Sequence, residues 1–296
     1  MSIFTGAGVA LVTPFKEDLS VDYDQLEKFI DFQINNGTDS IVICGTSGEA
    51  STMSHDEQIE VVSACVSHVN GRVPVIAGAG ANCTDEALNL AKRSEKAGAD
   101  GLLVVTPYYN KATQKGLEEY YTTVGNSVDI PIIMYNVPGR TGLNISVDTV
   151  VELAKHKNIQ AMKDATDNIA YAMEVLAKTA DLDFDLYSGC DDNILPFMAA
   201  GGKGVISVTS NLYPEAVEKL TQLILKGNIK EAQPLAYALD PISRLLFIDV
   251  NPIMPKAALA KMGVCGEHLR LPLIETTEEN KKALFGAMDE FEKLGY

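Results

Sequence analysis

The chain has 296 residues, and its 24 Lys and Arg residues against 40 Asp and Glu residues give a formal net charge of −16. Hydrophobic residues make up 46% and charged residues 22%, a composition typical of a globular protein and not of a disordered chain. The length suits one large α/β barrel, which needs about 250 residues. Because nucleic acids and anionic membranes attract clustered basic residues, the acidic balance excludes both as partners.

The sequence indicates neither a secretory leader nor a membrane span. The apolar runs at 41–44 and 102–105 are far shorter than the roughly 20 residues of a transmembrane helix. The five cysteines are odd in number, and no two stand in a Cys-x-x-Cys pair, so neither a disulfide framework nor a zinc site is indicated. We therefore predict a cytoplasmic protein with free thiols.

Eight short apolar segments alternate with helical patterns over the first 208 residues. Successive segments begin 19 to 33 residues apart, close to the length of one strand–helix unit. Their nearly continuous apolar character is typical of parallel strands covered by helices. Eight such units close most economically into a (β/α)8 TIM barrel, with an open doubly wound sheet as the alternative. The segments are 8–15, 40–45, 73–80, 101–107, 130–138, 159–165, 185–189 and 204–208.

Capping residues mark several of the helices between these strands. Ser54 followed by Glu57 forms a capping box, in which the serine hydroxyl accepts from an amide of the first turn, and this helix is expected to stop at Gly71. Further helices are predicted to begin at Thr84 and at Ser146.

The last 70 residues read as a helical extension of the barrel. A helix over 214–226 completes the eighth unit, and further helices are predicted at 229–247, 252–262 and 277–294, the last with a capping box at 276–279. No Gly-, Pro- or Ser-rich linker separates the barrel from this extension. We therefore expect a catalytic barrel of residues 1–226 with an extension of residues 227–296 packed on it.

Motifs for bound cofactors are incomplete in this sequence. Gly78-Ala79-Gly80 follows a strand as a dinucleotide-binding turn does, but Cys83 stands where the third glycine belongs. The four histidines show no metal-ligand spacing. We expect neither a nucleotide cofactor nor a metal.

Reactive side chains stand at the ends of three predicted strands, where the catalytic groups of such barrels lie. The second strand ends in Thr46 and Ser47 between glycines, the fourth in the tyrosine pair 108–109, and the fifth in Tyr135 followed by Arg140. A capped turn and aromatic packing are the structural alternatives for the first two. The arginine fork suits a carboxylate.

The sixth predicted strand places Lys163 on the same face as Ile159 and Ala161, because side chains alternate along a strand. Burial disfavours the ammonium form and lowers a lysine pKa, which makes the amine a nucleophile. The alternative is a lysine that reaches out to water from the strand end. With Tyr135 one strand away to move protons, a Schiff-base lysine explains the pattern better.

Taken together, these strand ends resemble the pyruvate-dependent class I aldolases typified by N-acetylneuraminate lyase. The resemblance rests on 45–49, 135–138 and Lys163, and it extends over the whole chain through 105–110, 140–142, 204–208 and 251–253. Ser47 departs from the commonest pattern, in which many members have threonine, but the hydroxyl is kept.

The resemblance implies a lyase without a cofactor other than its own covalent imine. Lys163 would form an imine with pyruvate, and the derived enamine would attack aspartate semialdehyde to give 4-hydroxy-tetrahydrodipicolinate, in lysine and diaminopimelate biosynthesis. Further roles follow from the resemblance residue by residue: Tyr135, Ser47 and a neighbouring subunit's Tyr109 as proton relay, Thr46 and the Gly189 and Ile206 backbones for the keto acid, and Arg140 for the aldehyde carboxylate.

The resemblance also implies a homo-oligomer, a tetramer built as a dimer of dimers, and feedback by lysine at a subunit interface. Gln58 stands where some lysine-sensitive members have histidine, which leaves regulation open. Two other functions stay open: a sister aldolase acting on a sialic acid or a 2-keto-3-deoxy sugar acid, and a non-catalytic keto-acid binding protein. The positions matching the lysine site are Ala50, Ser51, His55, Gln58, Asn82, Glu86 and Tyr108.

Overall fold

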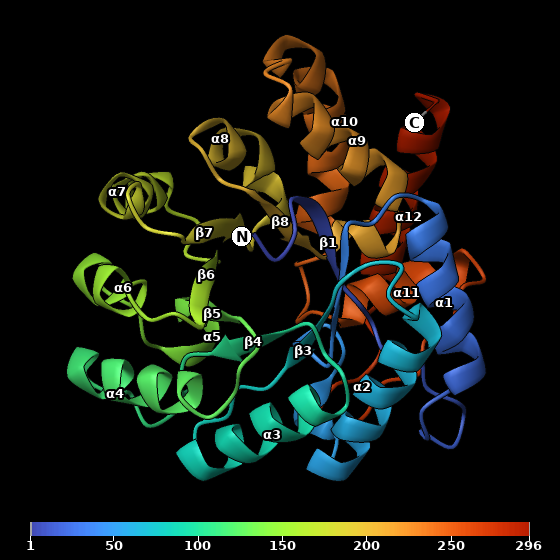
Figure 1. Ribbon diagram of the computed structural model, residues 1–296. Coiled ribbons are helices and arrows are strands. Elements are labelled where there is room, and N and C mark those ends of the chain that lie inside the picture. The colour runs from blue at the N-terminus through green and yellow to red at the C-terminus, as the bar shows by residue number, and fades with distance from the viewer. Residues whose placement is uncertain (1, 296) are drawn as a thin grey trace.

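The computed structural model describes residues 2–295. Over this range, eight parallel strands close into a barrel in which each strand pairs with the next and the last pairs with the first (Figure 1). Closure confirms the predicted (β/α)8 barrel and excludes the open sheet. The strands are β1 (Gly6–Ala10), β2 (Ser40–Ile43), β3 (Val75–Gly78), β4 (Gly101–Val105), β5 (Ile132–Asn136), β6 (Ile159–Asp164), β7 (Asp185–Ser188) and β8 (Gly204–Ser207).

The prediction of the first strand at 8–15 was wrong. Strand β1 begins two residues earlier, at Gly6, and ends at Ala10. Leu11 and Val12 are fully buried and therefore continue the apolar pattern. The Val12 amide, however, donates to the Asn211 side chain (3.0 Å) and not to a neighbouring strand. The apolar pattern correctly indicated that these residues are buried, but burial does not fix where a strand ends. The strand ends where the backbone amide finds a hydrogen-bond partner outside the sheet.

Helices surround the barrel and cover the outer side of its strands (Figure 1). The Ser54 hydroxyl accepts from the Glu57 amide (3.2 Å) and the Ser146 hydroxyl from the Thr149 amide (3.2 Å), which confirms both predicted caps. The helices of the barrel are α1 (Tyr23–Asn35), α2 (His55–Val69), α3 (Thr84–Lys96), α4 (Gln114–Gly125), α5 (Pro138–Thr141), α6 (Val147–Leu153), α7 (Ile169–Thr179), α8 (Ile194–Ala199) and α9 (Pro214–Leu225), with 3-10 turns η1 (Ala50–Thr52), η2 (Asp191–Asn193) and η3 (Thr209–Asn211).

The C-terminal extension is helical, as predicted, and comprises α10 (Ile229–Leu245), α11 (Ile253–Lys261) and α12 (Glu278–Lys293). Helix α10 packs against α9 and α8, and α12 packs against α10 and α11. The cap of α12 lies one residue later than predicted: Thr277 accepts from the Asn280 amide (3.2 Å), while the Thr276 hydroxyl bonds Asp249.

The division of the chain into a barrel and an extension at residue 226 stays a prediction. The first and last residues of these two predicted parts, Met1 and Tyr296, lie outside the described residues. Within residues 2–295, no helix combines the length and the apolar character that crossing a membrane would require.

Candidate active site

A central cavity of about 400 Å³ opens at the carboxyl ends of the barrel strands. Lys163, Tyr135 and Ser47 line it from β6, β5 and the turn after β2. The C-terminal extension closes it with residues such as Phe247 and Asn251. The predicted catalytic groups of one chain therefore meet in one place, and part of the wall comes from outside the barrel.

Lys163 and Tyr135 are direct neighbours across the paired strands β5 and β6. Their side chains are 5% and 7% exposed, and the Lys163 Nζ lies 4.5 Å from the centroid of the Tyr135 ring. The same strand register fixes the two side chains on the same face, because successive residues of a strand alternate. An amine and a phenol thus share a site from which most water is excluded.

The turn after β2 holds Ser47, which is buried, and Thr46, which is half-buried. The Ser47 Oγ accepts a hydrogen bond from the Asn251 Nδ2 at 2.9 Å. Glu49 at the end of this turn has a φ of 54°, a left-handed conformation that side chains rarely adopt. Thr46 also lines the central cavity, as Tyr135 and Lys163 do.

Arg140 lies on the short helix α5 after β5, where it is exposed and lines the cavity. Its Nη2 donates to the carbonyl of Asn251 at 3.4 Å, so Asn251 contacts both Ser47 and Arg140. Asn251 was missed as a site residue, although the sequence motif at 251–253 had already singled it out.

Gly189 follows β7 and donates its amide to the Asp164 carbonyl (2.7 Å). A Cβ at this position would lie 3.0 Å from the Lys163 Cε and 2.8 Å from the Ala165 Cβ. The site therefore requires glycine because the lysine side chain occupies the space. Ile206 is buried in β8 opposite Gly8, and its predicted contact with the keto acid stays a prediction.

Sequence reasoning missed the acidic residues after β7. Asp191 is buried in the cavity wall and accepts from the Val208 and Thr209 amides (2.9 and 3.2 Å) and from the Ser207 hydroxyl. Burial raises the pKa of Asp191, while these hydrogen bonds and the Lys163 charge oppose the rise. The position of Asp191 and Asp192 just after the end of β7 was the signal from which the sequence could have predicted them.

Asp167, Cys190 and Asp192 bring two carboxylates and a thiol within 4.8 Å of one another at the mouth of the cavity. Exposed acidic groups often gather in this way without an ion, so the cluster by itself does not indicate a metal site. Burial raises the pKa of the Cys190 thiol to about 12, and the neighbouring Asp192 and Asp167 carboxylates add to the rise.

A second, lateral cavity of about 520 Å³ shares Thr46, Tyr135 and Arg140 with the central one. Gln58 is buried, and its Nε2 donates to the carbonyls of Ala50 (2.9 Å) and Met53 (3.4 Å). These two hydrogen bonds hold the segment that follows the turn after β2. Six of the seven residues of the predicted lysine site line this cavity: Ala50, Ser51, His55, Gln58, Glu86 and Tyr108. The seventh, Asn82, accepts at its carbonyl from the Asn110 amide group (2.9 Å).

Tyr109 stands apart from both cavities, since its side chain is 89% exposed in the loop between β4 and α4. Its φ of 73° lies in the left-handed region. The structure of a single chain therefore does not bring Tyr109 to Lys163, and its role in the relay stays a prediction.

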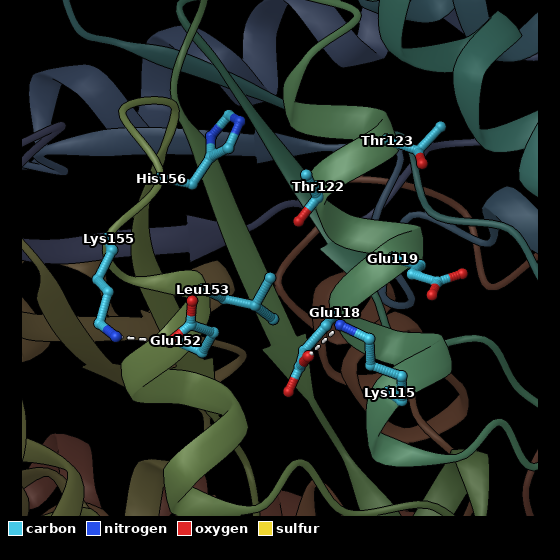
Figure 2. Close-up of a pocket in the computed structure, with 9 residues that line it drawn as sticks. All are labelled: Lys115, Glu118, Glu119, Thr122, Thr123, Glu152, Leu153, Lys155 and His156. Atoms are coloured by element: carbon cyan, nitrogen blue, oxygen red, sulfur yellow. Dashed lines mark hydrogen bonds and ion pairs between the residues drawn. The ribbon is translucent and has the colours of Figure 1, made fainter.

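A third cavity of about 530 Å³ is a groove between α4 and α6 (Figure 2). Both lysines of its lining pair within its own walls, Lys115 with Glu118 (3.0 Å) and Lys155 with Glu152 (2.5 Å). Because helix surfaces and not strand ends form it, we assign the chemistry to the central cavity.

A closed (β/α)8 barrel with a buried lysine beside a tyrosine at its strand ends defines an aldolase of the Schiff-base type. The chain belongs to the dihydrodipicolinate synthetase family, whose model matches residues 3–290. It is 50% identical, over 100% of its length and 99% of the relative, to the 4-hydroxy-tetrahydrodipicolinate synthase of Lachnoclostridium phytofermentans.

Solved structures agree with this membership. The dihydrodipicolinate synthase of Acinetobacter baumannii, crystallised with pyruvate, is 39% identical with a TM-score of 0.95, over 98% of this chain and 99% of that one. The enzyme of Cyanidioschyzon merolae with lysine bound is 37% identical with a TM-score of 0.95, over 99% of both chains. The predicted enzyme class, a lyase of lysine and diaminopimelate biosynthesis, is confirmed over the sister aldolases and over a non-catalytic binding protein.

Proposed function

We propose that this chain condenses pyruvate with aspartate semialdehyde through an imine on Lys163 and releases 4-hydroxy-tetrahydrodipicolinate. The observation that carries the proposal is the buried Lys163 amine, 4.5 Å from the Tyr135 ring centroid in the central cavity. The names of the relatives support the choice of substrates.

The first half-reaction uses the floor of the cavity. The Lys163 Nζ adds to the keto carbon of pyruvate, and water leaves as Tyr135 and Ser47 carry protons to and from the addition intermediate. Thr46 and the backbone amides of its turn face the pyruvate carboxylate. Loss of a proton from the methyl carbon then gives the enamine, with the imine nitrogen as electron sink.

The second half-reaction takes place nearer the mouth of the central cavity. The enamine carbon attacks the aldehyde carbon, while the guanidinium of Arg140 binds the carboxylate of aspartate semialdehyde in its rigid fork. The amino group of the adduct closes the ring onto the imine carbon and releases Lys163. This sequence of steps needs no cofactor beyond the lysine.

Reduction with borohydride in the presence of pyruvate tests the imine. A pyruvyl group should be fixed on the peptide that contains Lys163, and its absence would remove the mechanism. Arg140→Ala should leave this adduct intact but lower kcat/KM for the aldehyde by about 100-fold, the scale of a lost charge-assisted contact. An equal loss in both measurements would contradict the role of Arg140.

We infer a homo-oligomer from the exposure of Tyr109, which leaves its side chain free to serve the site of a neighbour; the tetramer of two dimers rests on the family resemblance alone. Mixing a Lys163→Ala variant with a Tyr109→Ala variant distinguishes the two arrangements. If Tyr109 acts across the interface, mixed dimers contain one complete site and activity returns. If it acts within its own chain, every site lacks one group and the mixture stays inactive.

We also infer that free lysine inhibits from the lateral cavity, where the Glu86 carboxylate would pair with an ammonium group. The lysine-bound structure from Cyanidioschyzon merolae supports this inference. Glu86→Gln should raise the half-inhibitory lysine concentration at least ten-fold, and unchanged inhibition would contradict the site. A cytoplasmic location is proposed from the five free cysteines of the described chain.

A further inference from the structure

A fully buried ion pair joins the turn after β2 to helix α11 of the C-terminal extension. The Lys256 Nζ lies 2.5 Å from the Glu49 Oε1, and both side chains are 0% exposed. Glu49 closes the turn that carries Thr46 and Ser47, so the pair connects the extension to residues of the central cavity.

Aromatic and backbone groups enclose the two charges. The Lys256 Nζ also donates to the carbonyl of His268 (2.6 Å) and lies 4.0 Å from the centroid of the Phe15 ring. The second oxygen of Glu49 accepts from the Arg270 amide (3.1 Å), and the Arg270 guanidinium lies 4.3 Å from the same Phe15 ring. Burial lowers the pKa of Lys256, and the Glu49 charge opposes that change.

Stability alone is a weak reason to keep such a pair. Desolvation of two ions offsets most of their attraction, and apolar residues of similar volume often serve a fold equally well. What the pair does fix is geometry, because the turn includes two residues in the left-handed region, Cys44 (φ 53°) and Glu49 (φ 54°). Such a backbone persists only where its surroundings hold it.

The extension reaches the turn at two points. Asn251 just before α11 donates to the Ser47 Oγ (2.9 Å), and Lys256 within α11 binds Glu49 two residues further along the turn. Thr13 and Thr52 add hydrogen bonds to the carbonyls of Gly48 (2.8 Å) and Glu49 (2.9 Å). The turn is therefore fixed at its end by groups outside its own strand.

We propose that Glu49 and Lys256 are positioning residues for the pyruvate half-reaction, which place Thr46 and Ser47 against the keto acid on Lys163. This inference rests on the proposed function, because it concerns the same imine.

The test compares variants that keep or remove the charges. Glu49→Asp keeps both charges and withdraws the carboxylate by one methylene, and the double variant Glu49→Gln/Lys256→Met removes both charges at similar volume. The matched control is Glu267→Gln/Lys281→Met, which removes another ion pair of the extension (2.8 Å, 19% and 14% exposed). It also removes the longer pairs of Lys281 with Glu275 (3.7 Å) and Glu278 (3.5 Å). Thermal unfolding is measured for all of them, and borohydride trapping of pyruvate on Lys163 is measured at increasing pyruvate concentration.

We expect Glu49→Asp and the double variant to lower the trapping rate divided by the half-saturating pyruvate concentration by about 10- to 100-fold, the effect of a misplacement of about 1 Å. The control should stay within about two-fold at a similar or larger loss of Tm. Folded Glu49→Asp with wild-type trapping would overturn the inference, as would a control that loses trapping equally. Absence of any adduct in the unaltered protein would instead overturn the proposed function.

Discussion

Gly189→Ala tests the central geometric claim, that the Lys163 side chain occupies the space beside Gly189. The added Cβ would lie 2.8 Å from the Ala165 Cβ and 3.0 Å from both the Asp164 carbonyl oxygen and the Lys163 Cε, where ordinary contact is 3.4–4 Å. Asp164 ends β6 and Ala165 follows it, and neither yields easily, so the backbone at residue 189 has to shift away from them. The Lys163 Cε, near the end of a flexible side chain, then gives way by a few tenths of an ångström. Overpacking of this kind costs about 1–3 kcal/mol of stability.

Restoring a contact of 3.4 Å moves the Lys163 Cε by about 0.4 Å. At about 100-fold per 1 Å of misplacement, this corresponds to about a six-fold loss of rate, or about 1.1 kcal/mol of barrier. Single-turnover borohydride trapping and steady-state kcat should both show it, with urea unfolding to measure stability. Gly286→Ala is the matched control, because nothing lies within 4 Å of a Cβ there and an alanine within α12 should add about 0.5–1 kcal/mol. A Gly189→Ala enzyme with kcat within two-fold of the original would refute the reasoning.

Three further variants test other parts of the structure. Burial raises the pKa of Asp164 from 3.8 to about 6, so the folded state binds this proton more tightly than the unfolded state and loses stability as pH rises through that window. Asp164→Asn should therefore stabilise by up to about 3 kcal/mol near pH 8, a gain that shrinks towards zero at about pH 4 in urea unfolding; an equal gain at both pH values would contradict the assignment. Gln58→Ala leaves the Ala50 and Met53 carbonyls without its amide and should cost about 1–3 kcal/mol in the same measurement. Asn251→Ala removes the donor to Ser47 and should lower kcat about ten-fold with little change in Tm, whereas unchanged kcat would show that Ser47 needs no such partner.

The fold could be predicted from the sequence because its signals are local and repeated. Apolar runs at strand–helix spacing predicted all eight strands, and hydroxyl caps such as Ser54 predicted where helices begin. The errors fell where a distant partner decides the local structure. Asn211 ends β1 through the Val12 amide, and Asp249 takes the Thr276 hydroxyl, so Thr277 caps α12.

The candidate site divides in the same way. Lys163 and Tyr135 could be found because strand alternation and strand order place them, and the structure brings both into the central cavity with Ser47. Asn251 and Asp191 were missed, although the 251–253 motif and the strand end before Asp191 pointed to them, because an asparagine before a helix and an aspartate after a strand have many ordinary uses. Their roles follow from partners 204 and 16 residues away in the chain.

The sequence by itself determined the barrel, the candidate lysine on its sixth strand and the family of the chain, because periodicity, strand ends and contiguous motifs are written in neighbouring residues. Only the tertiary structure showed that the extension completes the cavity, that Gly189 makes room for Lys163, and that Lys256 is buried against Glu49. The net charge of −16 did not indicate the two basic side chains that line the central cavity, Arg140 and Lys163. Contacts between residues distant in sequence arise from closure of the barrel, and a linear pattern does not record which side chains that closure brings together.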